Sequence, residues 1–331
     1  MGNEIKISII VAAYNVEQYI DRCLDSLTIQ DIPSYEYEII IVNDGSTDST
    51  LAILNKWKTN FDNIIVINQS NKGQSAARNL ALTQAKGDYV FYVDADDYIE
   101  KNCLGLLLNG CKGVDILRFG YFDAEVETFD GEYKKIYRGI SVFEHCYGIW
   151  SPWMQIFRKE FLLFNKLFFI EGMTSEDAEL IPRAYLLANS VTVIPEKIYH
   201  YVYNPVSTTK QRSYNFDRIY KRIESQHKVL GYCADLMVKY NGNKLVVDKL
   251  HDTVVYPTFT AFCVMILLEE IPFKVSKNFQ NAYHKSKFYP VIIHQKQTHK
   301  QRLMYKIMNS RLLFNLYYFS GLKKTYIRLY K

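Results

Sequence analysis

Several sequence patterns that identify common classes of protein are missing from this chain of 331 residues. No GxGxxG follows the first apolar run and no GxxxxGKS or GxxxxGKT occurs, so neither a dinucleotide-binding fold nor a P-loop is predicted. The six cysteines form no CxxC pair, which favours reduced thiols in a cytosolic protein. The longest apolar run, residues 254–268, is short for a membrane span and contains Pro257, so it predicts a buried helix. The N-terminus leads straight into an apolar run, without the pattern of a signal peptide.

Acidic residues are absent from residues 271–331, which contain 13 Lys or Arg. This segment therefore carries a formal charge of +13, whereas residues 1–270 carry −8. Cationic segments rich in aromatic residues bind anionic membrane surfaces, and a run of aromatic and aliphatic residues lies at 312–319. We predict a cytoplasmic protein in peripheral contact with the inner face of the cell membrane; a terminal helical hairpin packed on the rest of the chain is an alternative that could hold as well. Nucleic acid is disfavoured as a partner, because the rest of the chain is acidic and has no recognisable nucleic-acid module.

The first 100 residues alternate between short apolar runs and helical patterns. Such alternation predicts βαβ units and a mostly parallel sheet, as in a nucleotide-binding half of a doubly wound α/β fold. The predicted strands are Ile7–Val11, Glu38–Val42, Asn63–Ile67 and Asp88–Val93. Helical spacing of apolar residues lies between them, and again over residues 213–290.

The fourth predicted strand ends in three carboxylates within four residues, Asp94-Ala95-Asp96-Asp97. The carboxyl edge of a parallel sheet is where open α/β folds bind their ligands. Mg²⁺ and Mn²⁺ prefer carboxylate oxygens and usually take one or two from the protein, together with substrate phosphates. A metal-held diphosphate is therefore one interpretation. A solvated loop that caps the next helix is the other, and this segment alone does not decide between them.

Two further polar residues stand at places where they could contact a ligand. Asp44 ends the second predicted strand, where its carboxylate could accept the N–H of a pyrimidine base; turn formation and helix capping by residues 44–48 are the alternative. Arg78 lies on the helix after the third strand, and its planar guanidinium fits a phosphate or a carboxylate. A surface arginine is the alternative there.

Four motifs in this order resemble family 2 glycosyltransferases of the GT-A fold, over about residues 5–205. They are Val11-Ala12-Ala13-Tyr14-Asn15, Asn43-Asp44-Gly45-Ser46-Thr47-Asp48, Lys72-Gly73 with Ala77-Arg78-Asn79, and Asp94-Ala95-Asp96-Asp97. The resemblance implies a mostly parallel sheet flanked by helices in a catalytic domain at 1–210. Within it, a nucleotide-sugar half at about 1–100 would precede an acceptor half at about 101–210. Residues 211–331 would form a helical, basic C-terminal region.

The resemblance also implies roles for single residues. The positions Ala12, Tyr14 and Asp44 would hold the nucleotide base, and Arg78 would support the site. Asp94 and Asp96 would contact the ribose and bind a divalent metal ion, Mn²⁺ or Mg²⁺, with Asp96 the stronger candidate as metal ligand. Asp97 is expected only to cap the helix that follows.

The general base is expected in the segment Ser175-Glu176-Asp177, because the second acid of a Glu-Asp pair has that role in the resembled family. This selects Asp177, although acids in a first helical turn, capped by Thr174 or Ser175, would also stabilise a helix without any catalytic role. Acceptor or diphosphate contacts are weaker predictions, made for Trp153, Glu176, Ser207 and Thr208. Gln155 stands where the family often has Lys, which weakens the prediction of such contacts there.

Residues 199–203 alternate aromatic and other side chains and predict a strand that Asn204-Pro205 ends. His200 is expected to be a strand residue and no metal ligand. The predicted function is an inverting transfer of a sugar from a nucleotide-diphospho-sugar, with UDP as the expected nucleotide. The acceptor would be a saccharide, presumed from the basic C-terminal region to be lipid-linked, in cell-surface polysaccharide synthesis.

Two alternatives come from other classes of protein. A sugar nucleotidyltransferase also needs a metal-bound phosphate on an α/β sheet, but it predicts a Gly-rich loop after the first strand, where this chain has Ala12-Ala13-Tyr14-Asn15. A nucleotide-sugar-binding assembly protein without catalysis predicts that replacing Asp177 leaves function intact.

Overall fold

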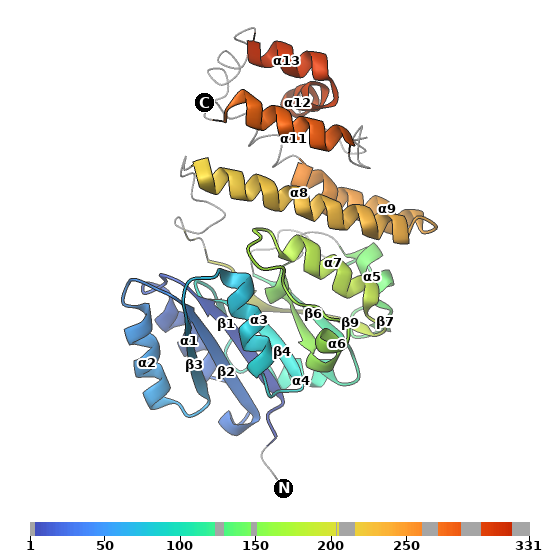
Figure 1. Ribbon diagram of the computed structural model, residues 1–331. Coiled ribbons are helices and arrows are strands. Elements are labelled where there is room, and N and C mark those ends of the chain that lie inside the picture. Colours follow the sequence, from blue (N-terminus) through green and yellow to red (C-terminus); the bar gives the residue numbers. More distant parts are fainter. Residues whose placement is uncertain are drawn as a thin grey trace. The chain divides into compact units, whose positions relative to one another are not determined.

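The computed structural model describes residues 4–122, 129–146, 151–202, 204, 216–259, 271–285 and 299–319 (Figure 1). The chain divides into two compact units. The first unit comprises residues 1–172 and 176–211, and the second comprises residues 173–175 and 212–331. The short segment Met173–Ser175 thus belongs to the second unit, although the chain on both of its sides belongs to the first.

One nine-stranded sheet forms the centre of the first unit, with the order β3-β2-β1-β4-β8-β6-β9-β5 and with β7 paired to β9. Its strands are β1 (Ile7–Ala13), β2 (Tyr37–Asp44), β3 (Ile64–Gln69), β4 (Tyr89–Asp94), β5 (Tyr98–Ile99), β6 (Ile116–Tyr121), β7 (Ile136–Tyr137), β8 (Gln155–Arg158) and β9 (Val191–His200). The four strands predicted in the first 100 residues are β1 to β4, each displaced by at most two residues at either end.

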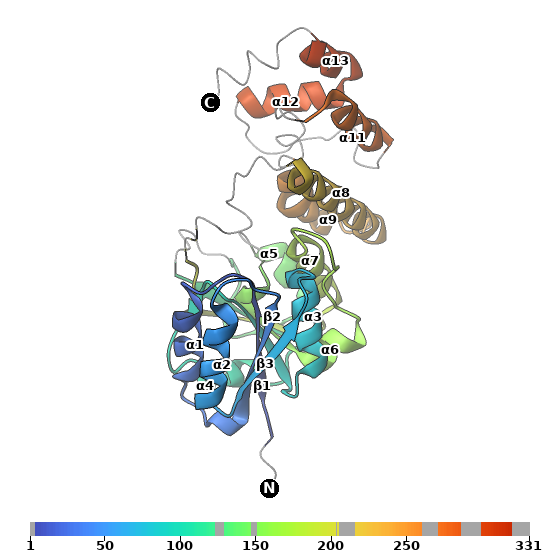
Figure 2. The same cartoon turned by 60° about the vertical axis from the view of Figure 1, so that its left-hand side comes forward.

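The strands β1, β2, β3 and β4 pair in parallel and are covered by helices on both faces, which is why they are nearly continuous apolar runs. Ile9, Val11 and Ile39 point into a core that they share with α1, α2 and α4, while α3 packs on the other face. Figure 2 shows α1, α2 and α4 on one side of these strands and α3 and α6 on the other. The helices are α1 (Ile20–Thr28), α2 (Thr50–Asn60), α3 (Gln74–Gln84), α4 (Leu104–Cys111), α5 (Gly139–His145), α6 (Lys159–Phe164) and α7 (Asp177–Leu187), with 3₁₀ turns η1 (Ser34–Glu36) and η2 (Pro152–Met154).

The carboxyl ends of six strands meet at one edge of the sheet. The strand β8 is antiparallel to both β4 and β6, so β4 and β6 run in the same direction, and β6 pairs with β9 in parallel. Asp44, Asp94, Tyr121 and His200, the last residues of β2, β4, β6 and β9, therefore all lie at this edge. The sheet thus places on one edge residues that are up to 156 positions apart in the sequence. The predicted α/β fold with flanking helices is confirmed.

One predicted strand ends earlier than expected. The alternation at 199–203 predicted a strand up to Asn204, but β9 ends at His200. The physical reason is that the backbone N–H of Val202 donates to the carboxylate of Asp97 instead of to a neighbouring strand (2.7 Å).

The second unit consists of helices in its described part. They are α8 (Phe216–Lys239), α9 (Lys244–Leu250), the π-helical turn η3 (His251–Val255), α11 (Phe273–Lys285), α12 (His299–Asn309) and α13 (Arg311–Phe319). Of the buried helix predicted at 254–268, residues 260–268 lie outside the described residues; residues 254–259 are helical, and Val255 and Phe259 are buried. In the described residues, no helix is both long and apolar enough to cross a membrane.

Candidate active site

The turn at the end of β4 holds the three carboxylates of the strand end in different environments. The N–H of Asp97 donates to the carbonyl of Asp94 (3.0 Å), which closes the turn. Asp94 and Asp96 keep part of their side chains exposed, whereas Asp97 is buried. The prediction that Asp97 caps a helix is wrong, because residues 98–99 form β5 and its carboxylate accepts hydrogen bonds from the Tyr199 hydroxyl and the Val202 N–H.

Asp96 has one amide partner and a carboxylate neighbour. The Asn204 side chain donates from Nδ2 to Asp96 Oδ2 (2.9 Å), and the Tyr19 hydroxyl donates to Asn204 Oδ1 (3.3 Å). Burial and the negative charge of Asp94 raise the pKa of Asp96 above its ordinary value. A cation bound between Asp94 and Asp96 would offset this repulsion.

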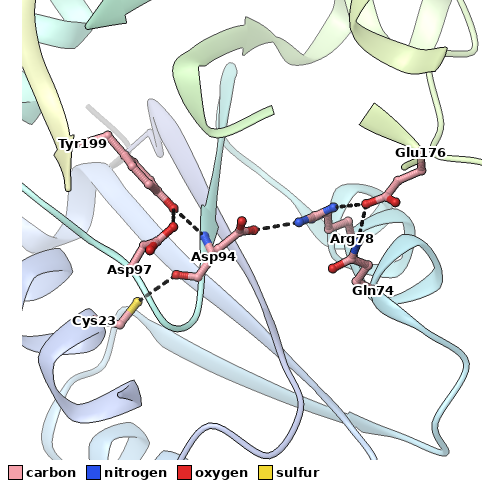
Figure 3. A network of polar contacts seen from close by, with 7 residues as sticks. All are labelled: Cys23, Gln74, Arg78, Asp94, Asp97, Glu176 and Tyr199. Atoms are coloured by element: carbon pink, nitrogen blue, oxygen red, sulfur yellow. Dashed lines mark hydrogen bonds and ion pairs between the residues drawn. The ribbon is translucent and has the colours of Figure 1, made fainter. Parts of the chain in front are cut away.

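Arg78 joins the end of β4 to the acid pair before α7. Its guanidinium donates from Nη2 to Asp94 Oδ1 and from Nη1 to Glu176 Oε1, both over 2.7 Å (Figure 3). The side chain lies on α3, is 5% exposed, and rests on the ring of Phe169, which is 5.1 Å from Cζ. Burial opposes its charge, but Asp94 and Glu176 outweigh that effect and raise the pKa of Arg78. Arg78 is therefore a carboxylate clamp and no surface arginine.

The acid pair has few hydrogen-bond donors. Glu176 accepts from Arg78 and from Gln74 Nε2 through Oε1, while its buried Oε2 has no partner in the described part of the chain. Asp177 is partly exposed, begins α7, and accepts from the Ala178 N–H (2.9 Å). Loss of water contact and the nearby Glu176 raise the pKa of Asp177 to about 7. A carboxylate with this pKa can accept a proton near neutral pH.

Within the described part of the chain, no side chain caps α7, contrary to the expectation for Thr174 or Ser175. Both residues belong to the second unit and contact its helix α8. The N–H of Thr174 donates to Ser225 Oγ (3.0 Å), and Gln226 Nε2 donates to Ser175 Oγ (2.9 Å). The backbone of Ser175 has a φ of +64°, which a non-glycine residue rarely adopts, so it is held by these contacts outside the helix.

The ends of β1 and β2 place the residues predicted to hold a nucleotide base. Tyr14 is 47% exposed just after β1, and Ala12 is partly exposed within it. Asp44 is buried, and its carboxylate accepts hydrogen bonds from Gln69 Nε2 and from the N–H groups of Lys72 and Gly73 (2.7–2.8 Å). These bonds hold the loop before α3, so Asp44 has a structural role whether or not it also contacts a base.

Trp153 is part of an aromatic stack at the same edge of the sheet. Its ring stacks on Tyr199 with centroids 4.4 Å apart and on Tyr201 with centroids 5.9 Å apart, and Tyr121 meets it edge-on. Because Trp153 is buried, it supports neighbouring rings more than it offers its own surface to an acceptor.

Gln155 and His200 have partners other than the carboxylates of the strand end and the acid pair. Gln155 is buried in β8, where its Oε1 accepts from Arg118 and Tyr185. A lysine at this position would place a second positive charge beside Arg118. His200 stacks between Tyr98 and Phe122, with centroids about 4 Å away, and pairs with Glu100, as a strand residue would. Ser207 and Thr208 lie outside the described residues.

The donor set fits a divalent ion such as Mg²⁺ or Mn²⁺. Asp94 and Asp96 offer hard oxygen atoms, and each keeps part of its side chain exposed. Among the described residues, no three His, Cys, Asp or Glu side chains gather into a complete metal site. Two carboxylates are what such ions usually take from a protein when substrate phosphates supply the remaining ligands.

Comparison with known families now decides the assignment. The family model described as Glycosyl transferase family 2 matches residues 8–174, just over half of the chain. The chain belongs to this family. The resemblance read from the four motifs is therefore confirmed.

Curated relatives agree with the family. The chain is 33% identical over 214 residues to the glycosyltransferase GlyA of Streptococcus pneumoniae, a match that covers 59% of this chain and 30% of GlyA. It is 29% identical over 283 residues to the poly(ribitol-phosphate) beta-N-acetylglucosaminyltransferase TarS of Staphylococcus aureus, covering 81% of this chain and 48% of TarS. The chain thus spans between about a third and a half of the length of these relatives.

Solved structures agree with the fold. A structure of S. aureus TarS 1-349 in complex with UDP-GlcNAc aligns with a TM-score of 0.66 at 23% identity, over 92% of this chain and 90% of that one. A mannosyltransferase from Pyrobaculum calidifontis, solved with GDP-Man and Mn²⁺, aligns with a TM-score of 0.57 at 15% identity, over 92% of this chain and 87% of that one. At these identities, the likeness shows the fold.

Sequence reasoning missed several residues of this network, above all Tyr199, Asn204 and Gln74. Gln74 lies four positions before Arg78, on the same face of α3, so helical spacing could have paired it with the clamp. The sequence pattern predicts Tyr199 only as part of a strand and Asn204 only as its end. Their contacts to residues 94–97 span more than 100 positions and leave no local pattern.

Proposed function

We propose that this chain is a metal-dependent, inverting glycosyltransferase that uses a nucleotide-diphospho-sugar, with UDP as the nucleotide. The observation that carries the proposal is the bridge of Arg78 between Asp94 and Glu176. It places the strand end that would hold the diphosphate beside the acid pair that would deprotonate the acceptor. TarS, which shares the fold, was solved with UDP-GlcNAc and with UDP, and this supports the choice of donor.

The residues would divide the reaction between them. Asp94 and Asp96 would hold Mg²⁺ or Mn²⁺, which when bound stabilises negative charge on the departing diphosphate. Asp177 would accept the proton of the acceptor hydroxyl as the oxygen forms a bond to the anomeric carbon. The bond from that carbon to the diphosphate oxygen breaks, and its electron pair leaves with the diphosphate. Attack from the face opposite the leaving group gives inversion.

Arg78 would hold the end of β4 and the start of α7 in a fixed position relative to each other. Its position between two carboxylates fixes the distance from the end of β4 to the start of α7. Tyr14, exposed beside the end of β2, would contact the nucleotide base, and Ala12 would leave room for it.

A donor screen tests this proposal. UDP-, GDP-, dTDP- and CMP-sugars are added with and without Mn²⁺ or Mg²⁺, and the melting temperature and the release of nucleotide are measured. Ligand binding raises the apparent stability by mass action, so a UDP-sugar should raise the melting temperature only when a divalent ion is present. If no nucleotide-sugar gives a metal-dependent shift or any release, the proposal is wrong.

We further propose a lipid-linked saccharide acceptor at the cytoplasmic face of the membrane, in the synthesis of a cell-surface polysaccharide. The curated relatives include enzymes named for poly(ribitol-phosphate), which supports a polymer product. In the second unit, Leu312 is 68% exposed and Phe319 is 73% exposed on α13, next to exposed basic side chains on α12 and α13. Apolar and cationic side chains together favour an anionic lipid surface.

Vesicle cosedimentation tests the membrane contact. A triple charge reversal, Arg302→Glu, Lys306→Glu and Arg311→Glu, should abolish binding to vesicles that contain anionic phosphatidylglycerol. The matched control reverses three exposed lysines of the first unit, Lys56, Lys58 and Lys101, and changes the net charge equally. Equal loss in both variants would indicate a net-charge effect, and unchanged binding in the first variant would exclude this surface.

A further inference from the structure

Hydrogen bonds join the turn that carries Asp94 and Asp96 to the end of β9 and the residues after it, and one hydroxyl group makes two of them. The Tyr199 hydroxyl donates to Asp97 Oδ2 (2.7 Å) and at the same time accepts from the backbone N–H of Asp94 (3.0 Å), as Figure 3 shows. The other oxygen of Asp97, Oδ1, accepts from the Val202 N–H (2.7 Å). Three hydrogen bonds therefore tie the turn to Tyr199 and Val202, 102 to 105 positions away; we call residues 199–202 and 204 the 199–204 segment.

The position of that hydroxyl is fixed by the packing of its ring. Tyr199 is fully buried, and its ring stacks on Trp153 at an interplanar angle of 12°. A tyrosine has only two side-chain torsions, and the stack restricts both of them. The hydroxyl is therefore held in one place before any ligand binds.

Asp97 is an unusual residue to find at this place. It is 1% exposed and lies near two other carboxylates, Asp94 and Asp96. A buried carboxyl group beside like charges destabilises a fold unless its hydrogen bonds compensate. An apolar residue would avoid this cost, so the arrangement points to a use for the bonds that Asp97 makes.

We infer that Tyr199, acting with Asp97, is a positioning residue that sets the orientation of Asp94 and Asp96 toward the metal ion and the diphosphate. The inference rests on the proposed function. Metal ligands must hold their distances within about 0.2 Å, so a small rotation of the turn weakens the site. The contact of Asn204 with Asp96 comes from the same 199–204 segment and fixes the second carboxylate. The segment thereby orients both candidate ligands without contacting the reacting atoms.

The decisive variant is Tyr199→Phe, which keeps the ring and its stack on Trp153 and removes only the hydroxyl. Tyr185→Phe is the matched control, because Tyr185 is also fully buried and donates its hydroxyl to a buried acceptor, Gln155 Oε1 (3.2 Å), away from the carboxylates. Mn²⁺ binding in the presence of UDP is measured by calorimetry or electron paramagnetic resonance, and the melting temperature is measured for both variants.

Tyr199→Phe should weaken Mn²⁺ binding by about 10- to 100-fold, the range found when a partner that orients a metal ligand is removed. Tyr185→Phe should leave Mn²⁺ binding unchanged while it lowers the melting temperature by a similar amount. Equal Mn²⁺ affinity in Tyr199→Phe and the wild type would overturn the inference. An equal loss in both variants would assign the effect to general destabilisation and would overturn it too.

Amide hydrogen exchange separates this inference from the proposed function. Tyr199→Phe should speed exchange at the Asp94 and Val202 amides, because both lose the structure that the hydroxyl holds. If the wild type binds no Mn²⁺ with UDP, the proposed function fails by itself. Unchanged exchange at both amides would show that the hydroxyl does not hold the turn, whatever the metal result.

Discussion

The strand end at 94–97 and the acid pair at 176–177 both place carboxylates side by side, but the protein surrounds them differently. At the strand end, Tyr199, Val202 and Asn204 supply neutral hydrogen-bond donors that fix the orientation of Asp96 and Asp97. At the acid pair, Asp177 accepts a hydrogen bond from the next residue of its own helix in the described structure.

This difference matches two different tasks. Neutral donors hold the geometry of carboxylates that must present oxygen atoms to a cation, and such a site tolerates little movement. A base must instead take up and release a proton, so it benefits from few donors and from a nearby like charge, which bring its pKa close to neutral. Arg78 is the element common to both, because it contacts Asp94 on one side and Glu176 on the other.

Removal of the proposed base alone is expected to have the largest effect on turnover. Asp177→Asn should lower turnover by about 10² to 10⁴, the range for loss of general base catalysis, because the amide cannot take the acceptor proton. Affinity for UDP with Mn²⁺ should remain that of the wild type, since the strand end is untouched. Turnover is measured as nucleotide release, and affinity is measured by calorimetry.

The control for that variant is Glu179→Gln, on the same helix. Glu179 is buried and pairs with Arg183, so the change perturbs α7 without removing the proposed base. If Glu179→Gln lost as much turnover as Asp177→Asn, or if Asp177→Asn kept its turnover, Asp177 would not be the base. The second result would favour a nucleotide-sugar-binding protein without catalysis.

A second variant separates the two regions by removing their bridge. Arg78→Met keeps the length of the side chain and leaves Asp94 and Glu176 without their cation. Breaking a buried ion pair typically destabilises by 3–5 kcal/mol, and since Asp94 is partly exposed we expect about 3 kcal/mol in urea denaturation. Arg183→Met, which breaks the more exposed pair with Glu179, should lower the free energy of unfolding by about 1 kcal/mol or less. Equal losses in the two variants would show that Arg78 is an ordinary ion-pair residue.

The parts of this site that the sequence predicts are those that neighbouring residues determine. The strands β1 to β4 are nearly continuous apolar runs because helices cover both faces of the sheet, and Asp44 and Asp94 follow directly at their ends. Chain order and the parallel sheet are then enough to predict that these residues share an edge.

The parts that sequence reasoning missed depend on long-range contacts. Arg78 and Glu176 are 98 positions apart, and nothing near either residue distinguishes a clamp from a surface ion pair. The prediction that Asp97 caps a helix fails because capping is the common role of an aspartate after a strand, whereas here the next two residues form β5. The sequence does contain one indication of the role of Asp97. Three carboxylates within four residues repel one another, so at least one of them needs hydrogen-bond donors from elsewhere in the chain.

A pH series tests the acid pair without altering the sequence, and we expect its effect to be the smallest of the three. Asp177 must be deprotonated to act as a base, so turnover should fall about tenfold for each pH unit below its pKa of about 7.

The raised pKa of Asp177 also makes the stability of the fold depend on pH. Between pH 4 and pH 7 the folded chain keeps a proton on Asp177 that the unfolded chain has released. The stabilisation from this proton is therefore complete below pH 4 and is lost as the pH rises toward 7. Urea denaturation at pH 5 and pH 8 should therefore show Asp177→Asn gaining stability relative to the wild type as the pH rises. The prediction fails if turnover shows no step near pH 7 and the stability difference between Asp177→Asn and the wild type does not change with pH. Asp177 would then have hydrogen-bond donors that stabilise its charge, as the carboxylates at the strand end do.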